Sequence, residues 1–187
     1  MRRKGFFWLV LGLALAISAF VLLSMWRMEE RAAEQSVSAA LRQLEECSPS
    51  HRPEMQAEER ELPGVLVIPA LDLRLPVAEE WSDAALQQTP CRYVGSAEGG
   101  GLVIAGHNYD AHFGRLRQLS AGETVIFTDW QGCCHSYRVT AAEILRPAEV
   151  EKMVGGEWAL TLFTCTPGGQ RRFALRCEAV SGEEKGE

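Results

Sequence analysis

Beyond its first four residues, the sequence has no excess of positive charge. The chain of 187 residues has a net charge of −6, although its first 26 residues include Arg2, Arg3 and Lys4 and no acidic residue. Those residues contribute +3, so residues 27–187 carry a net charge of −9. Proteins that bind nucleic acids mainly through the phosphates present a basic surface instead. The composition therefore argues against a nucleic-acid partner.

Internal repeats, low-complexity tracts and C-x-x-C pairs are also absent. Hydrophobic residues form 47% and charged residues 24% of the chain, close to the average of globular proteins, so a disordered or collagen-like chain is excluded. The six cysteines lack the short, fixed intervals of most zinc sites, and we therefore predict no metal site. The spacing leaves open a disulfide bridge among Cys91, Cys133, Cys134 and Cys177.

Charge of either sign is missing from Gly5 to Trp26, a run of 22 residues. A helix of this length spans the hydrocarbon core of a bilayer, which is about 30 Å thick. The alternative is a cleaved signal peptide, but its apolar core has typically about 7–15 residues. We predict an uncleaved membrane anchor. Basic residues precede the run and mixed charges follow it, so we expect a cytoplasmic N-terminus and an extracellular domain.

Four parts are expected along the chain: a cytoplasmic tip and transmembrane anchor (1–26), a helical and extended stem (27–61), a folded domain (62–180) and a polar tail (181–187). Apolar residues recur in the stem at helical spacing, at Val37, Ala40, Leu41 and Leu44. This spacing predicts a helix over 29–46, which Pro49 and Pro53 would end. The helix is either a spacer or packed on the flank of the domain.

Short segments rich in β-branched, aromatic and leucine residues alternate with Gly- and Pro-containing turns in the folded domain. The predicted strands cover 65–68, 71–75, 101–105, 124–128, 136–144, 158–164 and 172–177. Short helices are expected near 82–88 and 148–154, and a hairpin turn at 129–132. Many short strands with such turns indicate a mainly β sandwich or barrel.

Three residue types suited to acyl transfer stand at the ends of predicted strands. Cys165 closes one strand, Arg172 opens the next, and His107 follows a third. A thiolate attacks acyl carbons, an imidazole moves protons, and a cation stabilises the oxyanion. Taken singly, each residue has a commoner structural role, as a small buried thiol, a hydrogen-bonded strand-end histidine or a surface charge.

These same segments resemble a known family. Leu160-Thr-Leu-Phe-Thr-Cys165, followed by an arginine that opens a strand, resembles the TLxTC…R signature of the sortases. The segment from Val103 through His107-Asn108 is similar to their catalytic-histidine segment, and 66–77 is similar to their opening strands. The resemblance covers about 62–180. It implies a closed β-barrel of about eight strands with short helices, and the His–Asn pair and the anchor suggest class B or a relative.

The resemblance implies a membrane-anchored cysteine transpeptidase of a Gram-positive bacterium that uses no cofactor. Cys165 would attack the carbonyl of a threonine in the C-terminal sorting signal of a secreted protein, and His107 would transfer protons. An amine of a peptidoglycan precursor or pilin would accept the acyl group. Arg172 would bind the substrate backbone or the oxyanion. Lesser candidates for substrate or oxyanion binding are Thr164, Thr166 and Asn108.

Neighbouring residues limit these assignments. Successive strand residues face opposite ways, so only one of Arg171 and Arg172 can face Cys165, and we expect Arg172. Arg176 has the same parity but lies deeper in the strand, where a structural role is expected. We expect His112 and His135 at the surface or in turns.

Two other functions remain open from the sequence. The same three residues could act in a cysteine protease, with water as the acceptor. Alternatively, the domain could be a non-enzymatic, disulfide-stabilised β-barrel that binds a partner, and Cys165 would then be oxidised.

Overall fold

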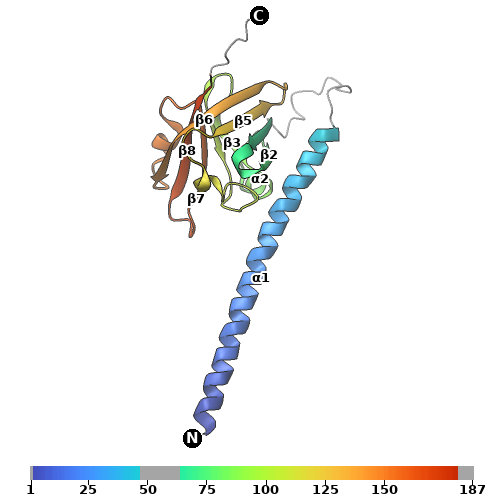
Figure 1. Cartoon of the computed structure of the whole chain (residues 1–187), viewed down its shortest axis with the longest axis vertical. Helices are drawn as coiled ribbons and strands as arrows, with labels where there is room; N and C mark the ends of the chain where they lie inside the picture. Colours follow the sequence, from blue (N-terminus) through green and yellow to red (C-terminus); the bar gives the residue numbers. More distant parts are fainter. Residues whose placement is uncertain (1, 47–63, 181–187) are drawn as a thin grey trace, which may run out of the picture.

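The computed structural model describes residues 2–46 and 64–180. Its first element, α1 (Arg2–Glu46), is one uninterrupted helix that runs along a β-barrel and projects beyond it (Figure 1). Within Leu11–Ala39, this helix contains a stretch long and apolar enough to cross a membrane, with a mean hydropathy of 1.8. The predicted break after the stem helix, Cys47 and the tail from 181 to 187 lie outside the described residues.

Eight strands form a single sheet in the order β2-β1-β5-β6-β8-β7-β4-β3. Their bounds are β1 Gly64–Ile68, β2 Leu73–Val77, β3 Cys91–Ser96, β4 Gly100–Ala105, β5 Thr124–Asp129, β6 Cys134–Leu145, β7 Leu160–Cys165 and β8 Arg172–Ala179. Among these strands, neighbours are antiparallel except β4 and β7, which are parallel. A bridge between Ala78 and Cys91 links the two edges, so the sheet is a nearly closed barrel. The predicted mainly β barrel is therefore confirmed.

Alternation along the strands separates an inner from an outer face of the barrel. The inner face forms the main core, which includes Leu66, Ile68, Leu102, Ile104, Leu160, Leu162 and Leu175. A smaller apolar cluster, made of Leu145, Met153 and Ala174 with Phe163 packed against it, lies apart from that core. Met153 belongs to α3 (Val150–Val154), which thus packs against β6, β7 and β8 from outside.

The seven predicted strands all exist, but β3 was missed. Its pairing with β4 has two register shifts, and Gly95 has a φ of +78°, so the regular alternation that marks a strand is lost. A Cβ on Gly95 would lie 2.1 Å from the carbonyl oxygen of Gly101, which explains why only glycine fits there. Prediction also began the second strand too early, because Pro69–Leu71 forms a 3-10 turn (η3) before β2.

The stem helix packs on the flank of the barrel. Ala33 and Val37 are buried, and the Ser36 hydroxyl donates a hydrogen bond to the Gln88 carbonyl oxygen at 2.7 Å. Gln88 ends α2 (Asp83–Gln88), which begins after the predicted turn and is capped by the Ser82 side chain. Of the two roles left open for this segment, the structure shows packing against the domain.

Candidate active site

The parallel pairing of β4 and β7 aligns the strand ends that carry the histidine and the cysteine. Ala105 lies level with Phe163, and the Gly106 amide donates to the Phe163 carbonyl oxygen at 3.0 Å. Two residues further along each chain, His107 and Cys165 reach the same level. In the antiparallel β7–β8 ladder, Cys165 lies opposite Arg172. Three neighbouring strands thus bring His107, Cys165 and Arg172 to one end of the barrel.

These three residues also share a face of the sheet. Leu162 and Thr164 are buried on the inner face of β7, so Cys165 faces outward with Phe163. Residues at the same level of neighbouring strands point to the same side, which places Arg172 on the outer face as well. All three side chains are half-buried, so substrate can reach them from outside the barrel.

The cysteine is available for chemistry. Cys165 and the other four described cysteines are free thiols, so no disulfide forms among Cys91, Cys133, Cys134 and Cys177. The binding-module interpretation, which requires an oxidised Cys165, finds no support among these residues. Cys91 and Cys177 are buried, and burial raises the pKa of their thiols to about 11 and about 12. Both therefore stay protonated and inert.

The imidazole of His107 is held mostly in its neutral form. Burial lowers its pKa, and the Asp83 carboxylate at the start of α2 opposes that effect. A ring contact with Tyr109, at a centroid distance of 5.0 Å, supports the imidazole from one side. Gly106 precedes it because a Cβ there would lie 2.5 Å from the Phe113 ring, which packs under the loop. The neutral ring can accept a proton.

Arg172 closes the β7–β8 turn in this structure. Its Nη1 donates hydrogen bonds to the carbonyl oxygens of Gly169 at 3.0 Å and Arg171 at 3.3 Å. Arg171 itself precedes β8 and is exposed. The β7–β8 register thus pairs Arg172, and not Arg171, with Cys165.

The three lesser candidates are directed or engaged elsewhere. Thr164 is buried on the inner face, away from the side that Cys165 faces, and its hydroxyl has no hydrogen-bond partner. The Thr166 amide donates to the Arg171 carbonyl oxygen at 2.9 Å. The Asn108 Oδ1 accepts a hydrogen bond from Arg117 at 3.1 Å. An oxyanion role for Thr166 would require the β7–β8 turn to open.

His112 is the clearest departure from the sequence-based expectation. It lies in a turn, but its side chain is completely buried and neither ring nitrogen has a hydrogen-bond partner. Burial, reinforced by the nearby His107, lowers its pKa to about 4, and the backbone of Gln88 offsets only part of this shift. The flanking Gly106 and Gly114 are the one sequence signal of a compact loop here.

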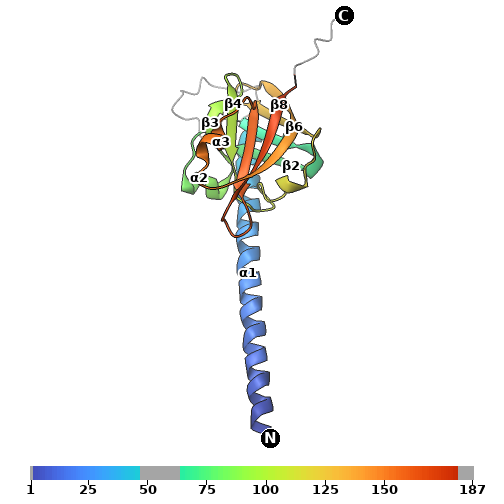
Figure 2. The same cartoon turned by 90° about the vertical axis from the view of Figure 1, so that its left-hand side faces the viewer.

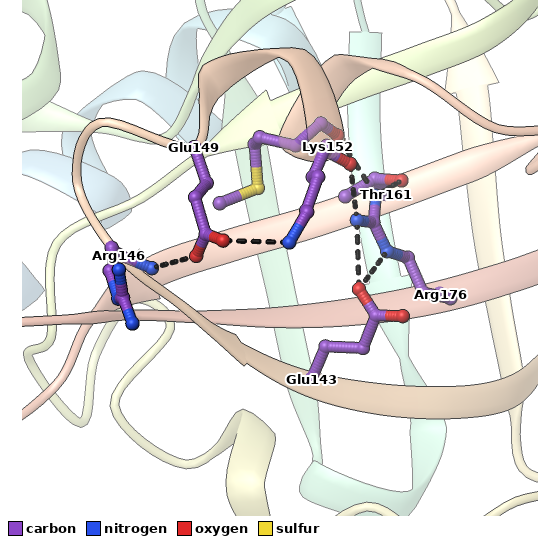
Figure 3. Close-up of polar contacts among 7 residues, drawn as sticks. Glu143, Arg146, Glu149, Lys152, Thr161 and Arg176 are labelled. Atoms are coloured by element: carbon purple, nitrogen blue, oxygen red, sulfur yellow. Dashed lines mark hydrogen bonds and ion pairs between the residues drawn. The ribbon is translucent and has the colours of Figure 1, made fainter.

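Arg176 is structural, as expected. It is 1% exposed and donates hydrogen bonds to the carbonyl oxygens of Lys152 and Met153 at 2.6 and 2.9 Å and to the Thr161 hydroxyl at 3.0 Å. Its ion pair with Glu143 completes the network shown in Figure 3. The two carbonyls belong to the last turn of α3, so Arg176 fixes that helix beside β7.

Other polar side chains lie away from the strand ends that carry the three residues. His135 pairs with Asp129 at 3.1 Å at the β5–β6 hairpin, at the opposite end of β6 from Leu145. Across residues 2–46 and 64–180, no three His, Cys, Asp or Glu side chains converge in a way that could hold a metal ion.

Comparisons with known proteins agree with this architecture. A sequence model described as "Sortase domain" matches residues 66–180, whereas no curated protein sequence matches. Sortase A from Corynebacterium diphtheriae is similar in structure, with 26% identity and a TM-score of 0.59, over 68% of this chain and 65% of that chain. The match thus spans slightly less than two thirds of the Corynebacterium chain.

Two further solved structures show the same fold. Sortase A from Listeria monocytogenes has 23% identity and a TM-score of 0.60, over 65% of this chain and 88% of that chain. Sortase C-1 from Actinomyces oris has 22% identity and a TM-score of 0.59, over 71% of this chain and 84% of that chain. The domain match covers more than half of the sequence, and the chain therefore belongs to the sortase family of cysteine transpeptidases.

Proposed function

We propose that this protein is a membrane-anchored sortase that joins secreted proteins to an amine of the cell envelope. The observation that carries the proposal is the register of β4, β7 and β8, which brings His107, Cys165 and Arg172 to one end of the barrel on one face. The three groups are those that thiol-dependent acyl transfer needs. Their family membership favours transfer to an amine.

The first half of the reaction makes a thioester. The Cys165 sulfur attacks the carbonyl carbon of a threonine in the sorting signal, which forms a C–S bond and an oxyanion. Arg172 leaves the β7–β8 turn and donates hydrogen bonds to the substrate backbone or the oxyanion. The peptide C–N bond then breaks as His107 gives a proton to the departing amine.

The second half transfers the acyl group. An amine of a peptidoglycan precursor or a pilin attacks the thioester carbon, and His107 takes the proton that this amine loses. A new C–N bond forms, the C–S bond breaks, and the thiolate returns. A neutral imidazole is the form required for this step, and burial of His107 favours that form.

The outer face around Cys165 offers apolar contacts for the sorting signal. Phe163 precedes Cys165 on the same face, Tyr93 packs edge-on against Phe163 at 5.5 Å, and Trp81 packs edge-on against Tyr93 at 6.3 Å. On the other side, α3 is fixed by Arg176. We infer that the sorting peptide lies over Phe163, between the aromatic side chains and α3.

The anchor places this end of the barrel near the membrane. Figures 1 and 2 show the β7–β8 turn, in orange-red, at the end of the barrel toward which the N-terminal half of α1 projects. With a cytoplasmic N-terminus, the catalytic domain would be extracellular and its active end would face the outer leaflet. A precursor held in the membrane and a lipid-linked amine would both be present there. Membership of class B stays a prediction, since the similar structures named above belong to classes A and C.

The test uses the full chain in detergent micelles or liposomes with a library of short sorting-signal peptides. Mass spectrometry should find a thioester on Cys165 and, after addition of oligoglycine or a diaminopimelate-containing peptide, an amide product. A Cys165→Ala variant is the control. A thioester that only water resolves would show a cysteine protease instead, and no adduct at all would refute both enzymes.

A further inference from the structure

The loop that carries His107 is a compact unit. The Tyr109 ring lies between the rings of His107 and His112, with centroid distances of 5.0 and 5.7 Å. The Phe113 amide donates to the His107 carbonyl oxygen at 3.0 Å, and the His112 amide donates to the Tyr109 carbonyl oxygen at 2.9 Å. A displacement of any part of this loop would therefore move the catalytic imidazole.

The helix α1 contacts this loop directly. The Glu30 Oε1 accepts a hydrogen bond from the Ala111 amide at 3.1 Å, across 81 positions of the sequence. The Glu29 and Glu30 carboxylates also reach Tyr109, whose pKa is raised by burial first and by these two charges second. The stem is thus connected to the middle of the histidine loop.

The contact belongs to one continuous face of α1. Glu30, Ala33 and Val37 follow one another at spacings of three and four residues, which places them on the same side of a helix. Ala33 and Val37 are 3% and 8% exposed, and Glu30 is half-buried. Glu34, one turn after Glu30, is exposed. A simple spacer would have no reason to bury this face or to direct a carboxylate at a loop amide.

We propose that residues 30–37 of α1 are part of the catalytic unit and that Glu30 is a positioning residue, which holds the loop of His107 in place by binding the Ala111 amide. The proposal rests on the catalytic role proposed for His107. It deepens that role, because the element that anchors the protein also positions its proton-transfer group.

The helix also sets the height of the loop above the membrane. From Trp26, the end of the uncharged run, to Glu30 an α-helix rises about 6 Å. The histidine loop is therefore attached to the helix about one turn beyond the end of that run. The anchor and the catalytic loop form one unit, which fixes the orientation of the active end toward the bilayer.

Three substitutions at Glu30 and one matched control test this inference in the full chain. Glu30→Ala removes the acceptor, Glu30→Asp keeps the charge but withdraws it by one methylene, and Glu30→Gln keeps an acceptor oxygen without the charge. We expect Glu30→Ala and Glu30→Asp to lower kcat about five- to tenfold, the worth of a hydrogen bond to a charged acceptor, with KM for the signal peptide unchanged. Glu30→Gln should recover most of kcat, and the control Glu34→Ala should match the wild type.

A second measurement does not depend on activity. The ring resonances of His107, assigned with His107→Gln, are followed by NMR through a pH titration that also reports Asp83, Glu29 and His112 in the surroundings. Glu30→Ala and Glu30→Asp should shift these resonances, whereas Glu34→Ala should not.

The possible outcomes separate this inference from the proposed function. If Glu30→Ala equals Glu34→Ala in both measurements, or if Glu30→Gln is as impaired as Glu30→Ala, the positioning role is wrong. If the wild type never forms a thioester, the proposed function is wrong, and the NMR comparison still decides whether Glu30 positions the loop.

Discussion

Arg172 lies opposite Cys165 at the end of the β7–β8 ladder, yet its guanidinium is bound to the turn that joins the two strands. The bonds to the Gly169 and Arg171 carbonyl oxygens keep this charge close to the thiol while no substrate is present. Substrate binding must replace these bonds with bonds to the peptide. The turn carbonyls then lose their donor, so turn and substrate compete for the same arginine.

Replacement of Arg172 by alanine should lower kcat for thioester formation roughly 100- to 1000-fold, the range found when an oxyanion donor is removed. Arg172→Lys should recover little, because lysine has no planar fork to match the peptide. Arg171→Ala is the matched control, and its kcat should stay within about twofold of the wild type. Equal losses for Arg171→Ala and Arg172→Ala in stopped-flow acylation would show that the register does not select the arginine.

A second prediction concerns the cysteines. Without reductant, iodoacetamide should label Cys165 together with the exposed Cys133 and Cys134, and it should spare the buried Cys91 and Cys177. Cys165→Ala should reduce transfer by roughly 1000-fold or more, whereas Cys134→Ala should leave it unchanged. Peptide mapping by mass spectrometry reads the labelling. A Cys165 that resists alkylation until reductant is added would contradict the free thiol.

The third prediction concerns Arg176. Arg176→Met should lower the free energy of unfolding by about 2–4 kcal/mol, because the Lys152 and Met153 carbonyls and the Thr161 hydroxyl lose their donor in a buried setting. It should also increase amide hydrogen exchange in α3 and raise KM more than it lowers kcat. Lys152→Met removes only the exposed ion pair with Glu149 and should change stability by less than about 0.5 kcal/mol. Unchanged exchange in α3 would show that Arg176 does not fix this helix.

The fourth prediction is the pH dependence of stability. The pKa of His112 is lowered by burial to about 4 in the folded protein, against an ordinary value near 6.5, so the unfolded chain binds the proton more tightly. Stability is complete above about pH 6.5 and is lost as the pH falls toward 4, by at most roughly 3 kcal/mol. Urea unfolding followed by tryptophan fluorescence measures this slope.

His112→Leu should flatten that slope, since no titrating ring remains in the interior. His135→Gln, at the β5–β6 hairpin, should leave the slope in place between pH 4.5 and 6.5. The same acid dependence in His112→Leu would assign the effect to other groups.

Much of the site could be predicted from sequence because its signals are local. Strand alternation, the turn after Cys165 and the parity of Arg171 and Arg172 all lie within a dozen residues. His112 was misjudged because burial of a side chain depends on what packs over it. Here the Tyr109 ring and the backbone of Gln88, from an element outside the loop, surround it. Nothing in a polar loop sequence reports such contacts.

The sequence by itself determined the membrane-length helix, the mainly β domain and the residue types at the strand ends, since these follow from local periodicity and chain chemistry. Tertiary structure alone decided that β4 and β7 are parallel neighbours, that the thiol is free, and that Glu30 binds the Ala111 amide. These depend on which distant segments pair. That choice is made by burial of the whole barrel, whose free energy no single segment contains.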